Sequence, residues 1–247
     1  MADQFSRTRL LVGDEPLARL AAAKVAVFGV GGVGGFCVEA LARAGVGTLH
    51  LYDDDTVSES NLNRQIVALH STIGQPKAEV MARRVLDINP ACQVEVFRMF
   101  YLPENAVQVD LSQYDYVVDC IDTVAAKLDL VERCTTLQVS ILSAMGSGNK
   151  LDPTAFRVTD LSKTQGCPLA RVMRKELRKR GITHLKVVYS TEEPLTPLQP
   201  AEEEAPAGTD TRPRSTARRA TPGSISFVPA AAGLVAASAV IRDLGGF

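Results

Sequence analysis

Short apolar runs alternate with amphipathic stretches along most of this chain, which predicts buried strands separated by helices. The apolar runs predict strands over Lys24–Phe28, Thr48–Tyr52, Gln93–Met99, Tyr114–Cys120 and Val139–Ala144. Apolar positions at helical spacing predict helices over Gly35–Ala44, Lys77–Ile88 and Leu169–Arg180. Strands and helices in alternation are typical of a parallel sheet covered by helices, so we expect an α/β fold.

The pattern breaks between residues 192 and 223. Six prolines and no aromatic residue fall in this stretch, together with three consecutive glutamates and several arginines. Such a segment cannot bury enough apolar surface to offset the cost of ordering, so we expect a flexible insertion within one domain spanning residues 1–247. The apolar run Ile225–Ile241 follows it. This run is short for a bilayer span and is interrupted by polar and helix-breaking residues, so we predict a buried helix, from about Ala230 onward, and no membrane association.

Composition narrows the function class. The chain has 247 residues, a net charge of −1 and 46% hydrophobic residues, which excludes a protein that coats nucleic acid by overall charge. Its five cysteines form no Cys-x-x-Cys pair, so neither a disulfide framework nor a structural zinc site is expected. The first residues contain no apolar run, so no secretory signal is expected and the predicted location is cytoplasmic.

The clearest motif is a glycine-rich turn at residues 29–34, Gly-Val-Gly-Gly-Val-Gly, between a predicted strand and a predicted helix. Glycines at Gly29, Gly31, Gly32 and Gly34 would let the backbone approach a phosphate, and a helix N-terminus presents unpaired N–H groups to it. Asp53 ends the next strand, at the spacing where a carboxylate accepts hydrogen bonds from ribose hydroxyls. We therefore expect a nucleotide site on a Rossmann-like sheet, parallel in its nucleotide-binding half, with helices on both faces.

Residues further along separate chemistry at a triphosphate from hydride transfer. A dehydrogenase needs little beyond the helix end and backbone amides, whereas a departing pyrophosphate requires cations. Arg64 and Lys77 would supply that charge, and Asp122, which closes the run Asp-Cys-Ile-Asp, would hold Mg²⁺. Asp122 would also be placed to cap a helix beginning near Thr123.

Together these motifs resemble the ubiquitin-activating-like adenylating superfamily. They comprise the glycine turn, Asp-x-Asp-x-Val from Asp53, residues 60–65 (Ser-Asn-Leu-Asn-Arg-Gln), the downstream lysine and the Asp-Cys-Ile-Asp strand end. Within that superfamily the chain is most similar to the tRNA threonylcarbamoyladenosine dehydratases. Residues 5–9 (Phe-Ser-Arg-Thr-Arg), 88–90 (Ile-Asn-Pro) and 158–161 (Val-Thr-Asp-Leu) contribute to this closer match, which covers nearly the whole chain apart from about 194–222.

The resemblance implies a set of roles. ATP and Mg²⁺ would be the cofactors, with Asp55 and Asn61 joining the residues above in the nucleotide site, and Arg7 would reach across a homodimer into the neighbouring site. The substrate would be tRNA carrying threonylcarbamoyladenosine beside the anticodon. ATP would activate its threonyl carboxylate, and a nitrogen of the same side chain would displace AMP to close a cyclic hydantoin. The resemblance also leaves room for a sulfur-transfer protein partner.

Several alternatives stay open. The chain would instead adenylate the C-terminal glycine of a ubiquitin-like sulfur carrier, sense nucleotide without catalysis, or act as an NAD oxidoreductase. Cys167 is either an acyl acceptor or a structural residue. The other four cysteines are expected in the core. The three histidines do not have the spacing of metal ligands. Residues 171–180 hold six Lys or Arg and one Glu, which fits either contact with tRNA phosphates or a solvated helix.

Overall fold

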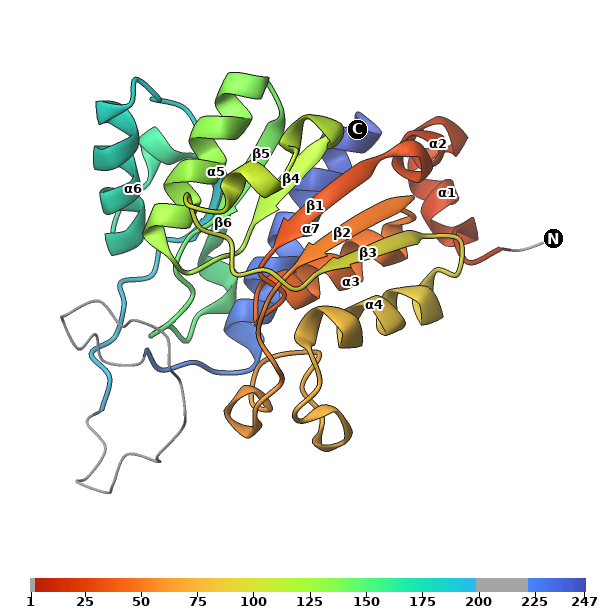
Figure 1. Ribbon diagram of the computed structural model, residues 1–247, viewed down its shortest axis with the longest axis horizontal. Helices are drawn as coiled ribbons and strands as arrows, with labels where there is room; N and C mark the ends of the chain where they lie inside the picture. The colour runs from red at the N-terminus through yellow and green to blue at the C-terminus, as the bar shows by residue number, and fades with distance from the viewer. Residues whose placement is uncertain (1–2, 199–221) are drawn as a thin grey trace.

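The computed structural model describes residues 3–198 and 222–247 (Figure 1). In this part of the chain the strands are β1 (Lys24–Phe28), β2 (Thr48–Tyr52), β3 (Gln93–Phe97), β4 (Tyr116–Asp119), β5 (Ser140–Ala144), β6 (Phe156–Asp160) and β7 (Lys186–Ser190). The α-helices are α1 (Ser6–Val12), α2 (Asp14–Ala22), α3 (Gly34–Ala44), α4 (Lys77–Ile88), α5 (Val124–Leu137), α6 (Pro168–Lys179) and α7 (Phe227–Gly245). Single 3₁₀ turns are η1 (Glu59–Asn61), η2 (His70–Thr72), η3 (Ala106–Gln108), η4 (Leu111–Gln113), η5 (Pro153–Ala155) and η6 (Leu161–Lys163).

The strands form one sheet in the order β3-β2-β1-β4-β5-β7-β6. Neighbouring strands are parallel except for the antiparallel pair β6 and β7 at one edge. The chain builds outward from β1 to β3 and then returns to place β4 on the other side of β1. In open α/β sheets, ligands bind in the crevice outside the carboxyl ends of the strands at such a reversal. The topology therefore directs attention to the ends of β1 and β4.

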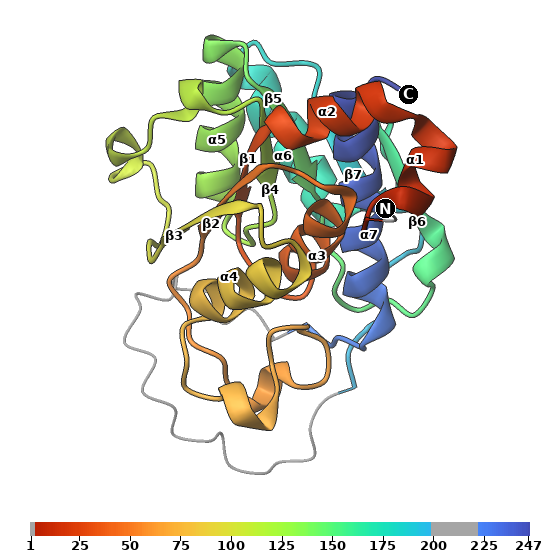
Figure 2. The ribbon, with the colours of Figure 1, turned by 90° about the vertical axis from the view of Figure 1, so that its right-hand side faces the viewer.

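Helices cover both faces of the sheet, as Figure 2 shows for α3, α4 and α7 on one face and α5 and α6 on the other. The alternation of β1 explains this arrangement. Val25 and Val27 pack into the layer of α3 and α7, while Ala26 and Phe28 pack toward α5. All four side chains are fully buried. The α/β fold with helices on both faces, predicted from the sequence, is confirmed.

Helix α7 is long and apolar enough to cross a membrane by length and composition. In the fold it packs against α3, α2 and the sheet, and buries Val228, Ala232, Ala236 and Val240 there. Its small residues let α3 approach closely, since a Cβ built at Gly233 would lie 2.3 Å from the carbonyl oxygen of Val33. The expected helix is present and begins slightly earlier than predicted; one side is buried against the core, while Phe227 and Leu234 are exposed.

The segment expected as an insertion lies partly outside the described residues, which stop at 198 and resume at 222. Its first part is held in place: the carboxylate of Glu192 accepts hydrogen bonds from the backbone N–H groups of Leu151 and Asp152. Asn149, with a φ of 59°, binds the chain on both sides of the gap. Its carbonyl oxygen accepts from the N–H of Leu195, and its backbone and side chain form two hydrogen bonds with Gly223. We call this arrangement the Asn149 clasp.

Candidate nucleotide site

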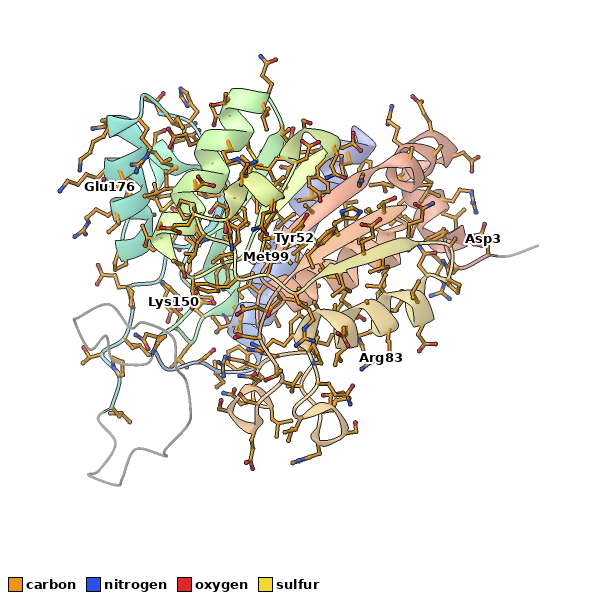
Figure 3. The ribbon with its side chains drawn as sticks, in the orientation of Figure 1. Asp3, Tyr52, Arg83, Met99, Lys150 and Glu176 are labelled. Atoms are coloured by element: carbon orange, nitrogen blue, oxygen red, sulfur yellow. The ribbon has the colours of Figure 1, made fainter. Side chains whose placement is uncertain are left out.

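A crevice of about 540 Å³ lies at the carboxyl ends of β1, β2 and β4. Its wall contains most of the residues predicted from the sequence to bind nucleotide: Gly29, Gly31, Gly32, Asp53, Asp55, Arg64, Lys77 and Asp122. Its apolar part is formed by side chains that include Phe28, Tyr52, Met99 and Tyr101. Figure 3 labels Tyr52 and Met99 near the centre of the molecule, where the strands end. The fold thus brings separated polar motifs together beside an aromatic wall.

The glycine turn divides into positions that shape the backbone and one that faces open space. Gly29 has a φ of 86°, and a Cβ there would lie 2.8 Å from the carbonyl oxygen of Cys120. A Cβ at Gly34 would lie 1.8 Å from the carbonyl oxygen of Gly29, so Gly34 serves helix packing and is absent from the crevice wall. A Cβ at Gly31 meets nothing closer than the Gln65 amide at 3.7 Å. The crevice is therefore open above Gly31.

Asp53 joins the end of β2 to this turn. Its carboxylate accepts hydrogen bonds from the N–H groups of Val30, at 2.7 Å, and Asp55, at 2.9 Å. Burial raises the pKa of Asp53 above its ordinary value, although both hydrogen bonds and the nearby Lys77 favour the ionised form. A carboxylate oxygen can accept more than one hydrogen bond, so Asp53 retains acceptor capacity toward the crevice.

Lys77 is the buried cation of the site. It is the first residue of α4, and its side chain is only 7% exposed. Its ammonium lies 2.8 Å from a carboxylate oxygen of Asp55, which is 35% exposed. Lys77 and Asp55 thus place a buried cation beside a partly exposed carboxylate in the crevice wall.

The segment after β2 supplies Arg64 and, next to it, a residue that the sequence did not single out for a role. The Arg64 guanidinium donates to the carbonyl oxygen of Ser60, at 2.7 Å, and to the side chain of Asn63, at 2.9 Å. Gln65 is buried, lines the crevice, and its side-chain oxygen has no hydrogen-bond partner among the described residues. A buried polar atom without a partner is costly, which makes a ligand the natural partner here. Only the folded structure shows that the Gln65 side chain is buried at the crevice. The sequence shows only that Gln65 follows Arg64.

Asn61 and Arg7 lie elsewhere. Asn61 is buried within its own turn, where its side-chain oxygen accepts from the N–H of Ser58 at 3.1 Å, and it does not line the crevice. Arg7 is exposed on α1. Figure 1 shows this helix near the end of the sheet where β1 begins. Within one chain, Arg7 is not part of the crevice wall. Its predicted role depends on a second copy and stays a prediction.

Asp122 is exposed at the crevice, just before α5, whose N-cap position is occupied by Thr123. Below it, Asp119 and Lys127 form a fully buried ion pair of 3.0 Å, and Ser143 donates to the same carboxylate. Asp119 also accepts from the N–H of Ile121, which fixes the loop leading to Asp122. The described residues hold no cluster of three metal-ligating side chains. A single carboxylate still fits Mg²⁺, because Mg²⁺ on a nucleotide takes most of its ligands from phosphates and water.

Four of the five cysteines are buried, and the fifth, Cys120, borders the crevice. Cys167 is buried and occupies the N-cap position of α6, where its sulfur accepts from the N–H of Ala170 at 3.5 Å. Cys37, Cys92 and Cys134 are buried, as expected. Cys120 is only partly buried and lines the crevice, but burial raises its pKa to about 12, so the thiol stays protonated.

Comparison with known proteins also indicates a nucleotide-binding protein. The model of the ThiF family matches residues 5–247. The chain is 44% identical to the tRNA threonylcarbamoyladenosine dehydratase of Bacillus subtilis, over 99% of this chain and 95% of that protein. Crystal structures of the Escherichia coli tRNA N6-threonylcarbamoyladenosine dehydratase in complex with AMP and with ATP superpose with a TM-score of 0.84 at 35% identity, covering 98% of this chain and 94% of theirs.

A more distant relative is the adenylyltransferase and sulfurtransferase of Candida glabrata. It is 32% identical over 60% of this chain but only 34% of that protein. The dehydratases of Bacillus subtilis and Escherichia coli match over nearly their whole length, and the sulfurtransferase does not. The chain therefore belongs to the ThiF family and, within it, to the tRNA threonylcarbamoyladenosine dehydratases.

Proposed function

We propose that this protein is an enzyme that uses ATP to dehydrate threonylcarbamoyladenosine in tRNA, next to the anticodon. The observation that carries the proposal is the convergence of Arg64, Lys77 and Asp122 on one crevice with the glycine turn. A dinucleotide-dependent dehydrogenase has no need of this charge arrangement. Relatives of nearly the same length bear the dehydratase name, and one of them binds ATP and AMP.

The proposed reaction has two steps. The threonyl carboxylate attacks the α-phosphate of ATP, forming an acyl-adenylate and releasing pyrophosphate. A nitrogen of the same side chain then attacks the activated carbonyl, loses its proton and displaces AMP, which closes a hydantoin ring with the net loss of one water. Ring closure is intramolecular, so much of its entropy cost is removed by tethering. The scheme needs no protein nucleophile, in keeping with the buried position of Cys167.

The charged and polar residues of the crevice would each bind a different part of the nucleotide. Lys77 and Arg64 would stabilise the negative charge that develops on the departing pyrophosphate. Asp53 would accept hydrogen bonds from the ribose, and the amides of the glycine turn would bind phosphate oxygens. Asp122 would hold Mg²⁺, which when bound would neutralise phosphate charge. Arg7 would complete the site of a second copy in a homodimer. A tRNA substrate also fits the cytoplasmic location expected from the sequence.

The deciding experiment is a mass measurement on the nucleoside. Purified protein incubated with ATP and threonylcarbamoyladenosine-bearing tRNA should shift the nucleoside mass down by one water and release AMP. An unchanged mass from protein that binds ATP would reject the proposal. Pyrophosphate exchange that requires a ubiquitin-like carrier and ignores tRNA would instead favour activation of a sulfur carrier.

A further inference from the structure

The exposed face of α6 carries positive charge that the nucleotide site does not use. Between Arg171 and Arg180 the sequence has six Lys or Arg and a single acid, Glu176. None of these residues lines the nucleotide crevice. Figure 3 labels Glu176 at the outer edge of the molecule, well away from Tyr52 and Met99 in the crevice. The charge therefore needs a separate explanation.

Half of these cations already have structural partners. The Arg174 guanidinium donates to the carbonyl oxygens of Leu161 and Thr164, which secures η6 against α6. Lys179 lies 2.8 Å from Glu176, and Arg180 lies 3.3 Å from Glu132 of α5. These contacts account for the cations that hold the helix in place.

Arg171, Lys175 and Arg178 remain, and we call them the α6 stripe. All three are exposed, and none has an ion pair or side-chain hydrogen bond within the part of the chain that the structure describes. Their spacing of four and three residues aligns them along one side of the helix, over about 10 Å. Like charges at this spacing repel, so the stripe slightly destabilises the free helix. A surface hollow of about 440 Å³ lies among these side chains and their basic neighbours.

The stripe suits a polyanion better than a membrane. A membrane-surface helix must offer its apolar side to lipid, but the apolar side of α6 is already occupied: Ala170, Met173 and Leu177 are buried in the cluster shared with α5 and β7. Val172 is the one large apolar side chain of α6 that is exposed, and the remaining outer surface is mostly long, flexible cationic side chains. Such side chains bind phosphates chiefly by charge, with release of counterions.

We propose that the α6 stripe binds the phosphate backbone of the tRNA substrate; this inference rests on the proposed function. The stripe lies on the side of α6 opposite Arg180, which pairs with Glu132 of α5, and none of its residues lines the crevice. The stripe therefore contacts RNA at a distance from the nucleotide being modified. It contributes to tRNA affinity and leaves the chemical step unchanged.

The test compares the triple variant R171Q/K175Q/R178Q with a control that removes the same charge elsewhere, R43Q/R83Q/R98Q. For the stripe variant, tRNA affinity should fall about 10- to 100-fold at moderate salt, and the slope of log affinity against log salt should become shallower by about 2 to 3. ATP affinity and turnover at saturating tRNA should stay at wild-type values. The control should behave like wild type in all assays.

Each other outcome has a defined meaning. Wild-type tRNA affinity and salt slope in the stripe variant would overturn the inference. So would loss of binding to anionic lipid vesicles with tRNA binding retained, because the stripe would then be a membrane surface. Equal losses in both variants would also overturn it, since they would reflect overall charge alone. The binding assay needs no turnover, so absence of water loss by the wild type would reject the proposed function separately.

Discussion

At the scale of single residues, the site combines opposite charges at unequal depth. Lys77 is buried beside Asp55, while Asp122 is exposed at the crevice. A buried cation loses little attraction to solvent screening, whereas an exposed carboxylate is free to share an ion with water and phosphate. This difference in depth predicts that Lys77 contributes mainly to the developing charge and that neighbouring polar groups contribute mainly to nucleotide affinity.

Replacing Lys77 with methionine should lower ATP–pyrophosphate exchange about 100- to 1,000-fold, because under the proposed function it removes the buried cation that stabilises the leaving pyrophosphate. Methionine has a similar shape, and Asp55 stays partly solvated, so the fold should persist. Exchange kinetics with the tRNA substrate measure the effect, and Lys24→Met, outside the crevice, serves as the control. Exchange within twofold of wild type would show that Lys77 is not part of the phosphate site.

Gln65→Leu should weaken ATP binding about tenfold without lowering the melting temperature. The buried side-chain oxygen has no hydrogen-bond partner among the residues that the structure describes, so an apolar replacement of similar size should remove only a contact with ligand. Calorimetric titration with ATP and thermal unfolding check the two halves of this prediction. A lower melting temperature with unchanged affinity would mean that Gln65 acts in packing.

At the scale of elements, local start and stop signals in the sequence explain which helices and strands were predicted correctly. The predicted bounds of β1, β2 and α4 coincide with those observed, and α3 and α4 end at the expected glycine and Asn-Pro signals. The helices α1 and α2 were not predicted, since α1 buries no residue and α2 buries only Pro16 and Leu20. The antiparallel pair β6 and β7 was also missed, because the two strands are joined through α6 and only tertiary packing pairs them.

The same limit applied to the site. The glycine turn, Asp53, Lys77 and Asp122 were recognisable because each follows a strand or begins a helix. The ion pair of Asp119 and Lys127 was not, because a lysine within a helix ordinarily faces solvent and only the fold buries it. Burial in the folded chain is what local sequence cannot supply.

Two alanine substitutions in the glycine turn should have opposite effects. Gly34→Ala should destabilise the protein strongly, because its Cβ would overlap the backbone of Gly29. Gly31→Ala should leave the unfolding midpoint near that of wild type, since its Cβ makes only an ordinary van der Waals contact. The same Cβ should weaken ATP binding at least tenfold, because it would occupy the space where the proposed function places the phosphates. Urea unfolding and ATP titration distinguish them. Undiminished ATP affinity in Gly31→Ala would place the phosphates elsewhere.

At the scale of the whole molecule, the absence of Arg7 from the wall of its own crevice makes the proposed homodimer testable. We expect Arg7→Ala and Lys77→Met each to be strongly impaired alone. A homodimer that shares Arg7 is isologous, so a mixed dimer contains one intact site. Mixing the two variants after dissociation should therefore restore about a quarter of wild-type activity. No recovery despite verified mixed dimers would show that Arg7 does not act across the interface.

Stability should depend on pH through His50, whose ring is buried at the sheet and lies 2.9 Å from the Tyr114 hydroxyl. Burial lowers the pKa of His50 below the ordinary 6.5, although the nearby negative charge of Glu95 acts to raise it. Below about pH 6.5 the unfolded chain then binds a proton that the folded chain does not, so stability falls as the pH drops. Urea unfolding at about pH 7.5 and about pH 5.5 should show a smaller loss for His50→Gln than for wild type. His70→Gln, which replaces an exposed histidine, should lose as much unfolding free energy between the two pH values as wild type. If His50→Gln also loses as much as wild type, other groups cause the pH dependence.

The Asn149 clasp has a consequence for engineering. Because Asn149 forms hydrogen bonds with both Leu195 and Gly223, a single residue holds the two ends of the connecting segment, whatever the length of chain between them. Doubling that length adds only about 0.6 kcal/mol of closure entropy. A reporter domain inserted there should therefore leave ATP binding and turnover near wild-type values, and loss of ATP binding by a folded fusion protein would contradict this expectation.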